Sequence, residues 1–309
     1  AELHLALQWA HFQTGILYDE HLLTGTYPKD LKVLFVPGLE VVTADVLQKL
    51  NFLRQQGVIL IGDEFTLPAL MLDHRLHSVT RNHNDPAGSK KALQNLGRDL
   101  AILLDRYGVR SNVADQQDLI LRERGDSEGK YRYLFAVNDR RTFGDYVGQW
   151  GLVPEKGVPL RSKVTLRKKA HAAYDLVQHR EIPLEQSPEA SSLQISLPGG
   201  GGKVIVLLDQ KIEKIRLQLP KEVKRGSAYT LEMSVADKAG KNIPAILPVE
   251  LRLKDSAGRE LPGSGYYAAE NGKFLLREIM AKNAQAGKVT VFCKCLASGK
   301  TAQNSFIVK

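Results

Sequence analysis

The sequence predicts a multidomain chain in which an α/β domain with a parallel sheet is followed by two all-β domains, each a β-sandwich. Two features predict this fold class. In the first third, short apolar runs alternate with amphipathic helical stretches, as in parallel sheets that are buried on both faces. Further on, apolar residues recur at every second position, which is typical of strands. At 309 residues the chain has room for two or three domains, and we place them at residues 1–110, 111–210 and 211–309.

The parallel sheet is predicted from the stretch between Leu31 and Glu64. An apolar run in Lys32–Leu39 ends in Pro-Gly, and a second run, Val58–Gly62, follows one amphipathic helix. Parallel strands joined by a helix show this pattern. The elements expected in this domain are a leading helix that stops before Gly15, strands over Gly15–Glu20, Val33–Val36 and Val58–Gly62, and helices over Thr43–Gln56 and Lys90–Tyr107.

The chain starts with a helical pattern, whereas an open α/β sheet normally starts with a strand. Leu3, Leu7, Ala10 and Phe12 recur at nearly helical spacing. We therefore expect the chain to be the carboxyl-terminal part of a longer protein, with any secretion signal upstream. No apolar run approaches the ~18 residues that a membrane-spanning helix needs, so we expect no membrane span.

The remaining two thirds of the chain read as strands separated by turns. Turns are predicted at Gly125-Asp126, Gly199–Gly202, Asp237–Lys241 and Asp255–Arg259. Strands of this number and spacing predict two sandwiches, the last of them Ig-like. The expected strands are Asp118–Arg124, Tyr131–Asn138, Val158–Leu166, Ala172–Val177, Leu193–Leu197 and Lys203–Leu208, then Lys214–Pro220, Ala228–Ala236 and Pro248–Lys254.

The net charge of +9 does not by itself predict a nucleic-acid partner. Basic residues are spread along the chain with acids between them, and no base-stacking aromatic pattern accompanies them. The densest basic group lies in residues 161–169 and alternates with Val164 and Leu166. We expect the solvated face of a strand there. The alternatives are contact with an acidic polysaccharide or a cell surface, and, less in keeping with the pattern, nucleic acid.

The candidate active-site position is the end of the strand at Gly62, because ligands of parallel sheets bind at the carboxyl ends of strands. Asp63 and Glu64 stand there, and no Cys or Ser does. Glu20 and His21 lie at the end of the strand expected over Gly15–Glu20. In a parallel sheet they can therefore meet Asp63 and Glu64 at one edge. Such carboxylates can act as general acid and base on a glycoside, bind a cation, or cap helices and loop amides. We expect the capping role.

The α/β stretch resembles the class I glutamine-amidotransferase-like domain, especially the flavodoxin-like version that follows the barrel in family 42 β-galactosidases and serves in trimer formation. In the catalytic relatives the second strand leads into a Gly-x-Cys-x-Gly elbow. Aligning Gly62 with its first glycine puts Glu64 in the place of the nucleophile and Thr66 in that of the second glycine. A strained elbow needs small neighbours, so the resemblance implies a domain that has lost its chemistry.

Two further resemblances concern the β-domains. Leu121–Arg124 followed by Tyr131–Asp139, with Phe-x-x-Asn at the strand end, resembles the small β-domain that closes many glycoside hydrolases. Val235–Lys241, Leu253–Arg259 and Tyr266–Phe274 resemble the macroglobulin-type and other Ig-like modules of secreted bacterial proteins. Such modules act as spacers or contact domains, and they imply a secreted or periplasmic location.

Aromatic residues in the loop between Arg140 and Gly157 are the candidate carbohydrate ligands. Tyr146 and Trp150 can stack on a sugar ring, because apolar sugar faces pack on aromatic planes. Anchoring the long loop by packing is the alternative and the reading that we prefer.

Histidines and cysteines offer no stronger site. His74 and His77 would share one helix face, with His83 nearby, but two ligands do not make a metal site. His179 and Glu181 form a His-x-Glu pair that we read as an ordinary strand pair. Cys293 and Cys295 share one face of a strand and are expected as buried thiols, with a metal pair or redox chemistry as alternatives.

Together these features predict a non-catalytic accessory, oligomerisation and scaffold region of a larger secreted glycoside-hydrolase-like bacterial protein. No cofactor is expected. The expected partners are upstream domains of the same protein, with a second copy of the chain and a carbohydrate as further candidates. The alternatives are a glycoside or amide hydrolase that uses Asp63 and Glu64, with Glu20 or His21, and a carbohydrate-binding module.

Overall fold

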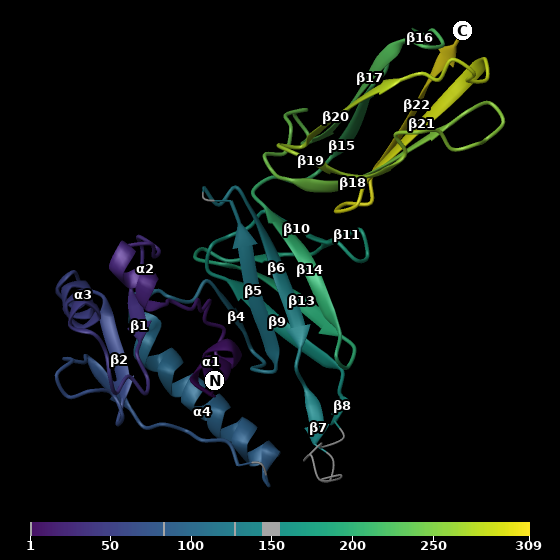
Figure 1. The fold of residues 1–309 in the computed structure, drawn as a ribbon. Coiled ribbons are helices and arrows are strands. Elements are labelled where there is room, and N and C mark those ends of the chain that lie inside the picture. Colours follow the sequence, from purple (N-terminus) through teal and green to yellow (C-terminus); the bar gives the residue numbers. More distant parts are fainter. Residues whose placement is uncertain (1, 83, 127, 144–154) are drawn as a thin grey trace. The chain divides into compact units, whose positions relative to one another are not determined.

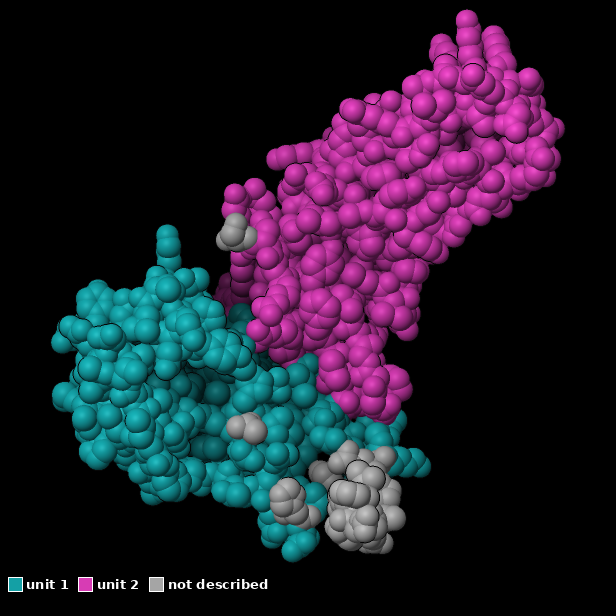
Figure 2. Space-filling view, viewed as in Figure 1, with its two compact units in different colours: residues 1–120, 139–159 teal, residues 121–138, 160–309 magenta. Residues whose placement is uncertain are grey.

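The computed structural model describes residues 2–82, 84–126, 128–143 and 155–309. The chain divides into two compact units (Figure 2). The first contains residues 1–120 and 139–159, and the second contains residues 121–138 and 160–309. The fold class agrees with the sequence prediction, since a small parallel α/β sheet comes first and several antiparallel sheets follow (Figure 1).

The first unit is built on a three-stranded parallel sheet in the order β1-β2-β3. The helix between the first two strands begins at its N-cap Thr43, whose side chain accepts a hydrogen bond from Val46 N. The strands are β1 (Val33–Phe35), β2 (Ile59–Asp63) and β3 (His74–Leu76), and the helices are α1 (Glu2–Trp9), α2 (Asp19–Thr24), α3 (Ala44–Gln55) and α4 (Pro86–Leu104), with a 3₁₀ turn at Asp105–Tyr107.

Alternate side chains of the sheet enter two separate cores. Leu60 packs with Val46 and Leu50 of α3, whereas its neighbour Ile61 packs with Leu7 of α1 and Leu100 of α4. Successive side chains of a strand point to opposite faces, so the sheet is covered on both sides. This burial explains the continuous apolar runs of the sequence.

The prediction of a strand over Gly15–Glu20 is wrong. Residues 13–18 form no strand, and α2 begins at Asp19. His21 Nδ1 accepts a hydrogen bond from Tyr18 N at 3.1 Å, and the helix ends at Gly25, which has a φ of 72°. Acidic residues in the first turn and a glycine at the end favour a helix, and these local signals prevail over the apolar residues before Asp19.

The prediction that His74 and His77 share one helix face is also wrong. His74 belongs to the strand β3, which pairs with β2 from Ile61 opposite His74 to Asp63 opposite Leu76. His77 follows the end of β3, and neither histidine lies in a helix. The two imidazoles therefore do not form a pair of ligands on one face.

The second unit begins with a β-sandwich. One sheet has the order β11-β10-β14-β6-β5, and the other contains β12, β13 and β9 in that order. Strand β6 matches the predicted Tyr131–Asn138 at both ends. The strands are β5 (Leu119–Gly125), β6 (Tyr131–Asn138), β9 (Leu160–Leu166), β10 (Ala172–Asp175), β11 (Arg180–Ile182), β12 (Glu185–Gln186), β13 (Ser191–Leu197) and β14 (Gly202–Leu208); β4 (Asn112–Ala114), β7 (Arg141–Phe143) and β8 (Glu155–Gly157) belong to the first unit.

A second sandwich completes this unit, with sheets in the orders β15-β17-β20 and β16-β22-β21-β18-β19. Asp237 and Asp255 each begin a five-residue turn in which the aspartate carboxylate accepts a backbone N–H from the fourth residue after it. Both turns were predicted. The strands are β15 (Lys214–Gln218), β16 (Glu222–Val223), β17 (Ala228–Ala236), β18 (Leu247–Lys254), β19 (Gly265–Ala269), β20 (Lys273–Ile279), β21 (Gly287–Cys295) and β22 (Thr301–Val308).

An apolar cluster of the second unit includes residues of both sandwiches, from Ala172 to Val308. It includes Tyr174 and Val206 of the first sandwich and Cys293 and Cys295 of the second. Both cysteines are buried free thiols, as predicted, and burial raises the pKa of Cys293 to about 11. Within the described part of the chain, no helix has the length and apolar character required to cross a membrane.

Candidate functional site

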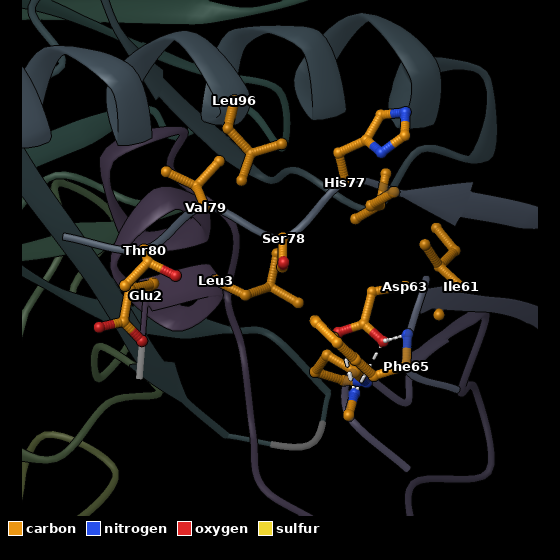
Figure 3. Close-up of a pocket in the computed structure, with 14 residues that line it drawn as sticks. Glu2, Leu3, Ile61, Asp63, Phe65, His77, Ser78, Val79, Thr80 and Leu96 are labelled. Carbon is orange, nitrogen blue, oxygen red and sulfur yellow. Dashed lines mark hydrogen bonds between the residues drawn. The ribbon is translucent and has the colours of Figure 1, made fainter. Parts of the chain in front are cut away.

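A pocket of about 310 Å³ lies in the first unit at the carboxyl ends of the parallel strands (Figure 3). Gly62 and Asp63 come from the end of β2, and Pro37 and Gly38 from the loop after β1. The segment after β3, residues 77–80, and the start of α1 form the rest of the rim. The sequence placed the candidate site at this edge.

The Asp63 carboxylate holds the loop that follows β1 against the turn that follows β2. Gly38 N donates to both carboxylate oxygens at 2.9 Å, and Phe65 N donates to Oδ1 at 3.1 Å. Thr66 Oγ1 lies 3.1 Å from the same Oδ1 and accepts from Asp63 N at 2.9 Å. The side chain is only 7% exposed. Asp63 is therefore the hydrogen-bonding centre of a turn.

The turn after β2 does not have the form of a nucleophile elbow. None of residues 62–66 has a positive φ, and the segment between β2 and β3 contains no helix. A side chain at Gly62 would bring its Cβ within 2.5 Å of Thr66 Oγ1 and 2.7 Å of Leu72 Cδ1. Glycine is thus needed here for the packing of Thr66, and the strained strand–turn–helix arrangement of an elbow is missing.

Glu64 points to the segment after β3. Ser78 donates to its carboxylate twice, from N at 2.9 Å and from Oγ at 2.7 Å. The hydrogen bond from the Ser78 side chain lowers the pKa of Glu64. A general acid in a glycosidase needs a raised pKa. The pKa of Glu64 is lowered instead, so its carboxylate is ionised at neutral pH and accepts hydrogen bonds.

The remainder of the pocket lining has an apolar part and a polar rim. Leu3, Ile61 and Leu96 contribute apolar side chains. In the view of Figure 3, Ser78 lies between Thr80 and Asp63. The rim carboxylate of Glu2 is paired with Arg81, whose Nε lies 3.2 Å from its Oε1. No lysine or arginine is among the lining residues, all of which the structure describes.

Glu20 and His21 do not join this site. Both lie in α2, and neither lines the pocket. Glu20 is exposed, and His21 is occupied as the acceptor of the Tyr18 N–H at the start of the helix. The expectation that they meet Asp63 and Glu64 depended on the strand over Gly15–Glu20, which does not form.

The other candidates give no second site. Tyr146, Trp150 and His83 lie outside the described residues. His179 sits in the turn between β10 and β11, where its Nδ1 lies 2.5 Å from Leu296 O, and Glu181 pairs with Lys211 at 2.8 Å. Across the described ranges, no group of three or more His, Cys, Asp or Glu side chains is placed to hold a metal ion.

Sequence reasoning missed the pocket residues Glu2, Ser78 and Thr80. Glu2 reaches the sheet edge because α1 packs on α4, and Ser78 and Thr80 arrive there because β3 pairs with β2. Neither contact has a signal in the local sequence. The alternation of the polar Ser78 and Thr80 with Val79 is the one sequence feature that points to this segment.

Comparisons with known proteins give structural neighbours only. No protein-family model and no curated protein matches the chain. Part of the structure is similar to α-L-fucosidase isoenzyme 2 from Paenibacillus thiaminolyticus, with 10% identity and a TM-score of 0.47 over 68% of this chain and 45% of that one.

Two other solved structures are similar over about a third of the chain. Superoxide reductase (neelaredoxin) from Ignicoccus hospitalis has 18% identity and a TM-score of 0.23 over 32% of this chain and 82% of that one. β-Glucosidase from Listeria innocua has 17% identity and a TM-score of 0.22 over 31% of this chain and 16% of that one. The fold described above rests on the structure of this chain itself.

Proposed function

We propose that this chain is a non-catalytic accessory and scaffold region of a larger secreted glycoside-hydrolase-like protein. In this proposal the α/β unit supplies contacts to upstream domains or to a second copy of the chain, and the two sandwiches act as spacers. The secreted or periplasmic location is part of the same proposal. It is supported by the resemblance of the last domain to Ig-like modules.

The observation that carries the proposal is the use of Asp63. Its carboxylate lies at the carboxyl end of β2, one residue before Glu64 at the nucleophile position, and it accepts hydrogen bonds from Gly38 N and Phe65 N. A catalytic base must be within reach of a substrate proton, and an acceptor filled by loop amides is poorly placed for that. Glu64, with its lowered pKa, supports the same interpretation.

Turnover assays of the 309-residue chain test the proposal. We expect no release of aryl alcohol from a panel of aryl glycosides and no release of ammonia from glutamine above the rate without protein. Glu64→Gln and Asp63→Asn should be equally inactive. The proposal would be overturned if the wild-type chain turned over one of these substrates and Glu64→Gln abolished that activity. Glu40→Gln, on the neighbouring loop, is the control and would then retain it.

A further inference from the structure

We infer that the pocket at the carboxyl edge of the β1-β2-β3 sheet binds a single neutral pyranose sugar without transforming it. This inference goes beyond the accessory role and does not depend on it, because binding a sugar requires acceptors and an apolar surface, whereas hydrolysis also requires a proton donor. It assigns a ligand class to a cavity whose carboxylates have a structural use.

The size of the pocket sets the size of the ligand. A volume of about 310 Å³ lies at the lower end of the ~300–1,000 Å³ that small-molecule sites span. One ring with its substituents is the scale of molecule that such a volume encloses. A longer oligosaccharide would have to extend from the rim into solvent.

The charges of the lining argue for a neutral ligand. Glu2 and Asp63 line the pocket and no lysine or arginine does, so a phosphate or carboxylate ligand would lie near two carboxylates without a lysine or arginine to pair with it. A cation would need a carboxylate whose charge is not already compensated. Glu2 is paired with Arg81, and Asp63 is surrounded by N–H donors from Gly38 and Phe65.

The arrangement of apolar and polar groups fits a pyranose. Phe65 is 54% exposed at the pocket rim, and an aromatic plane packs against the apolar C–H face of a sugar ring. Ser78 and Thr80 line the pocket, and the Ser78 hydroxyl donates to the carboxylate of Glu64, which is not a lining residue. Hydroxyl groups of a sugar both donate and accept, so they can bond to the hydroxyls of Ser78 and Thr80.

Ligand-observed saturation-transfer NMR and calorimetry of the full 309-residue chain test this inference. The probes are D-glucose, D-galactose and L-fucose, each added up to millimolar concentration. We expect saturable binding of at least one of them. Phe65→Ala should weaken that binding about tenfold, because it removes the stacking surface, and Thr80→Val should weaken it through loss of one hydroxyl without a change of shape.

Phe52→Ala is the matched control. Phe52 is 46% exposed on α3 and does not line the pocket, so this variant should bind as the wild type does. The inference is overturned if none of the three sugars binds, or if Phe65→Ala and Thr80→Val both keep the wild-type affinity.

The two proposals fail in different ways. Binding accompanied by turnover of the bound sugar overturns the non-catalytic role and the statement that the sugar is not transformed, while the location of the sugar in the pocket stands. Absence of both binding and turnover overturns the pyranose site alone.

Discussion

At the scale of the residue, the chain shows how a carboxylate at the end of a parallel strand, where ligands of such sheets bind, can have a structural use. Asp63 stands at the carboxyl end of β2 and is nearly buried, and its acceptors are directed at the amides of Gly38 and Phe65. A buried carboxylate that accepts N–H groups contributes more than a neutral acceptor, because the hydrogen bonds are charge-assisted.

Replacing Asp63 tests this use. Asp63→Asn keeps the shape of the side chain but replaces one carboxylate oxygen by an NH₂ group, which cannot accept from Gly38 N or Phe65 N. We therefore expect the free energy of unfolding to fall by about 1–2 kcal/mol. Urea unfolding followed by tryptophan fluorescence measures the change. Glu40→Gln replaces an exposed carboxylate nearby and should leave the urea midpoint unchanged. Equal midpoints for the two variants would mean that Asp63 does not hold the turn.

A second residue, His11, links the stability of the first unit to pH. Its ring is 2% exposed and its Nε2 lies 3.0 Å from Leu119 O. Burial, together with the charge of Arg110, lowers the pKa of His11 from 6.5 to about 4, although the hydrogen bond to Leu119 O opposes this shift. The folded ring is therefore neutral and donates to the carbonyl at neutral pH.

Acidification should destabilise the chain through this residue. Between pH 6.5 and about pH 4 the unfolded chain binds a proton at His11 that the folded chain does not bind. The free energy of unfolding should therefore fall by about 3 kcal/mol across this window and gain no further His11 dependence below it.

His11→Asn should remove this part of the pH dependence. Asparagine accepts the positive φ of 65° at this position and retains an N–H donor, so the variant should fold. Urea midpoints from pH 7 to pH 4 should fall less steeply for the variant than for the wild type. Acidic residues contribute equally to both curves, so subtracting one curve from the other leaves the contribution of His11. Parallel curves would show that His11 is not the group responsible.

At the scale of the element, the packing of α1 on α4 depends on one glycine. A Cβ at Gly97 would lie 2.5 Å from Ala6 O and 3.2 Å from the Ala10 Cβ. Since the first of these atoms belongs to the backbone of α1, it cannot move without the whole helix. The close approach brings Glu2 and Leu3 of α1 to the pocket.

Gly97→Ala should therefore destabilise the chain although alanine is the better helix former. Alanine favours the helix by ~1 kcal/mol, but forcing α1 away from α4 costs about 1–3 kcal/mol or more, so we expect a net loss. Asp99→Ala, at an exposed position two residues on, gains in propensity without a clash and should be neutral or slightly stabilising. Urea unfolding of both variants gives the comparison, and a stabilised Gly97→Ala would contradict the close packing.

The elements also show which parts of the fold the sequence could predict. Strands β6 and β17 were predicted to the residue, because each is long and alternates, with one face in a core. The segment 15–24 was misjudged, since Ile16, Leu17 and Tyr18 have the apolar character of a strand while the structure leaves Ile16 and Tyr18 exposed with no neighbouring strand. A strand of three residues such as β3 is too short to show a period at all.

The candidate site divides in the same way. Asp63 was found because it directly follows a buried strand, and the position of such a strand end follows from local sequence. Glu2 and Thr80 were not found because tertiary packing alone brings α1 and the segment after β3 to that edge. Local patterns identify the centre of the site, and long-range contacts supply its rim.

At the scale of the whole molecule, the two compact units differ in how their cores are built. The first unit has several smaller apolar clusters around its sheet, whereas a continuous cluster of the second unit includes residues of both sandwiches, between positions 172 and 308. Tyr174 of β10 is fully buried in that cluster, and its Oη accepts the backbone N–H of Ile212 at 2.8 Å. Ile212 lies at the point where the sequence suggested a boundary between two separate sandwich domains.

Calorimetric unfolding of the full chain distinguishes these descriptions. Because the cluster is continuous, we expect two cooperative transitions, one for each unit, with both sandwiches unfolding in the same transition. Tyr174→Phe leaves the buried Ile212 N–H without its acceptor, which costs about 1–3 kcal/mol, and should lower the temperature of that shared transition alone. Tyr266→Phe, at a largely exposed ring, should change neither transition. Three transitions, with Tyr174→Phe affecting only the one that belongs to residues 111–210, would favour the three-domain division predicted from the sequence.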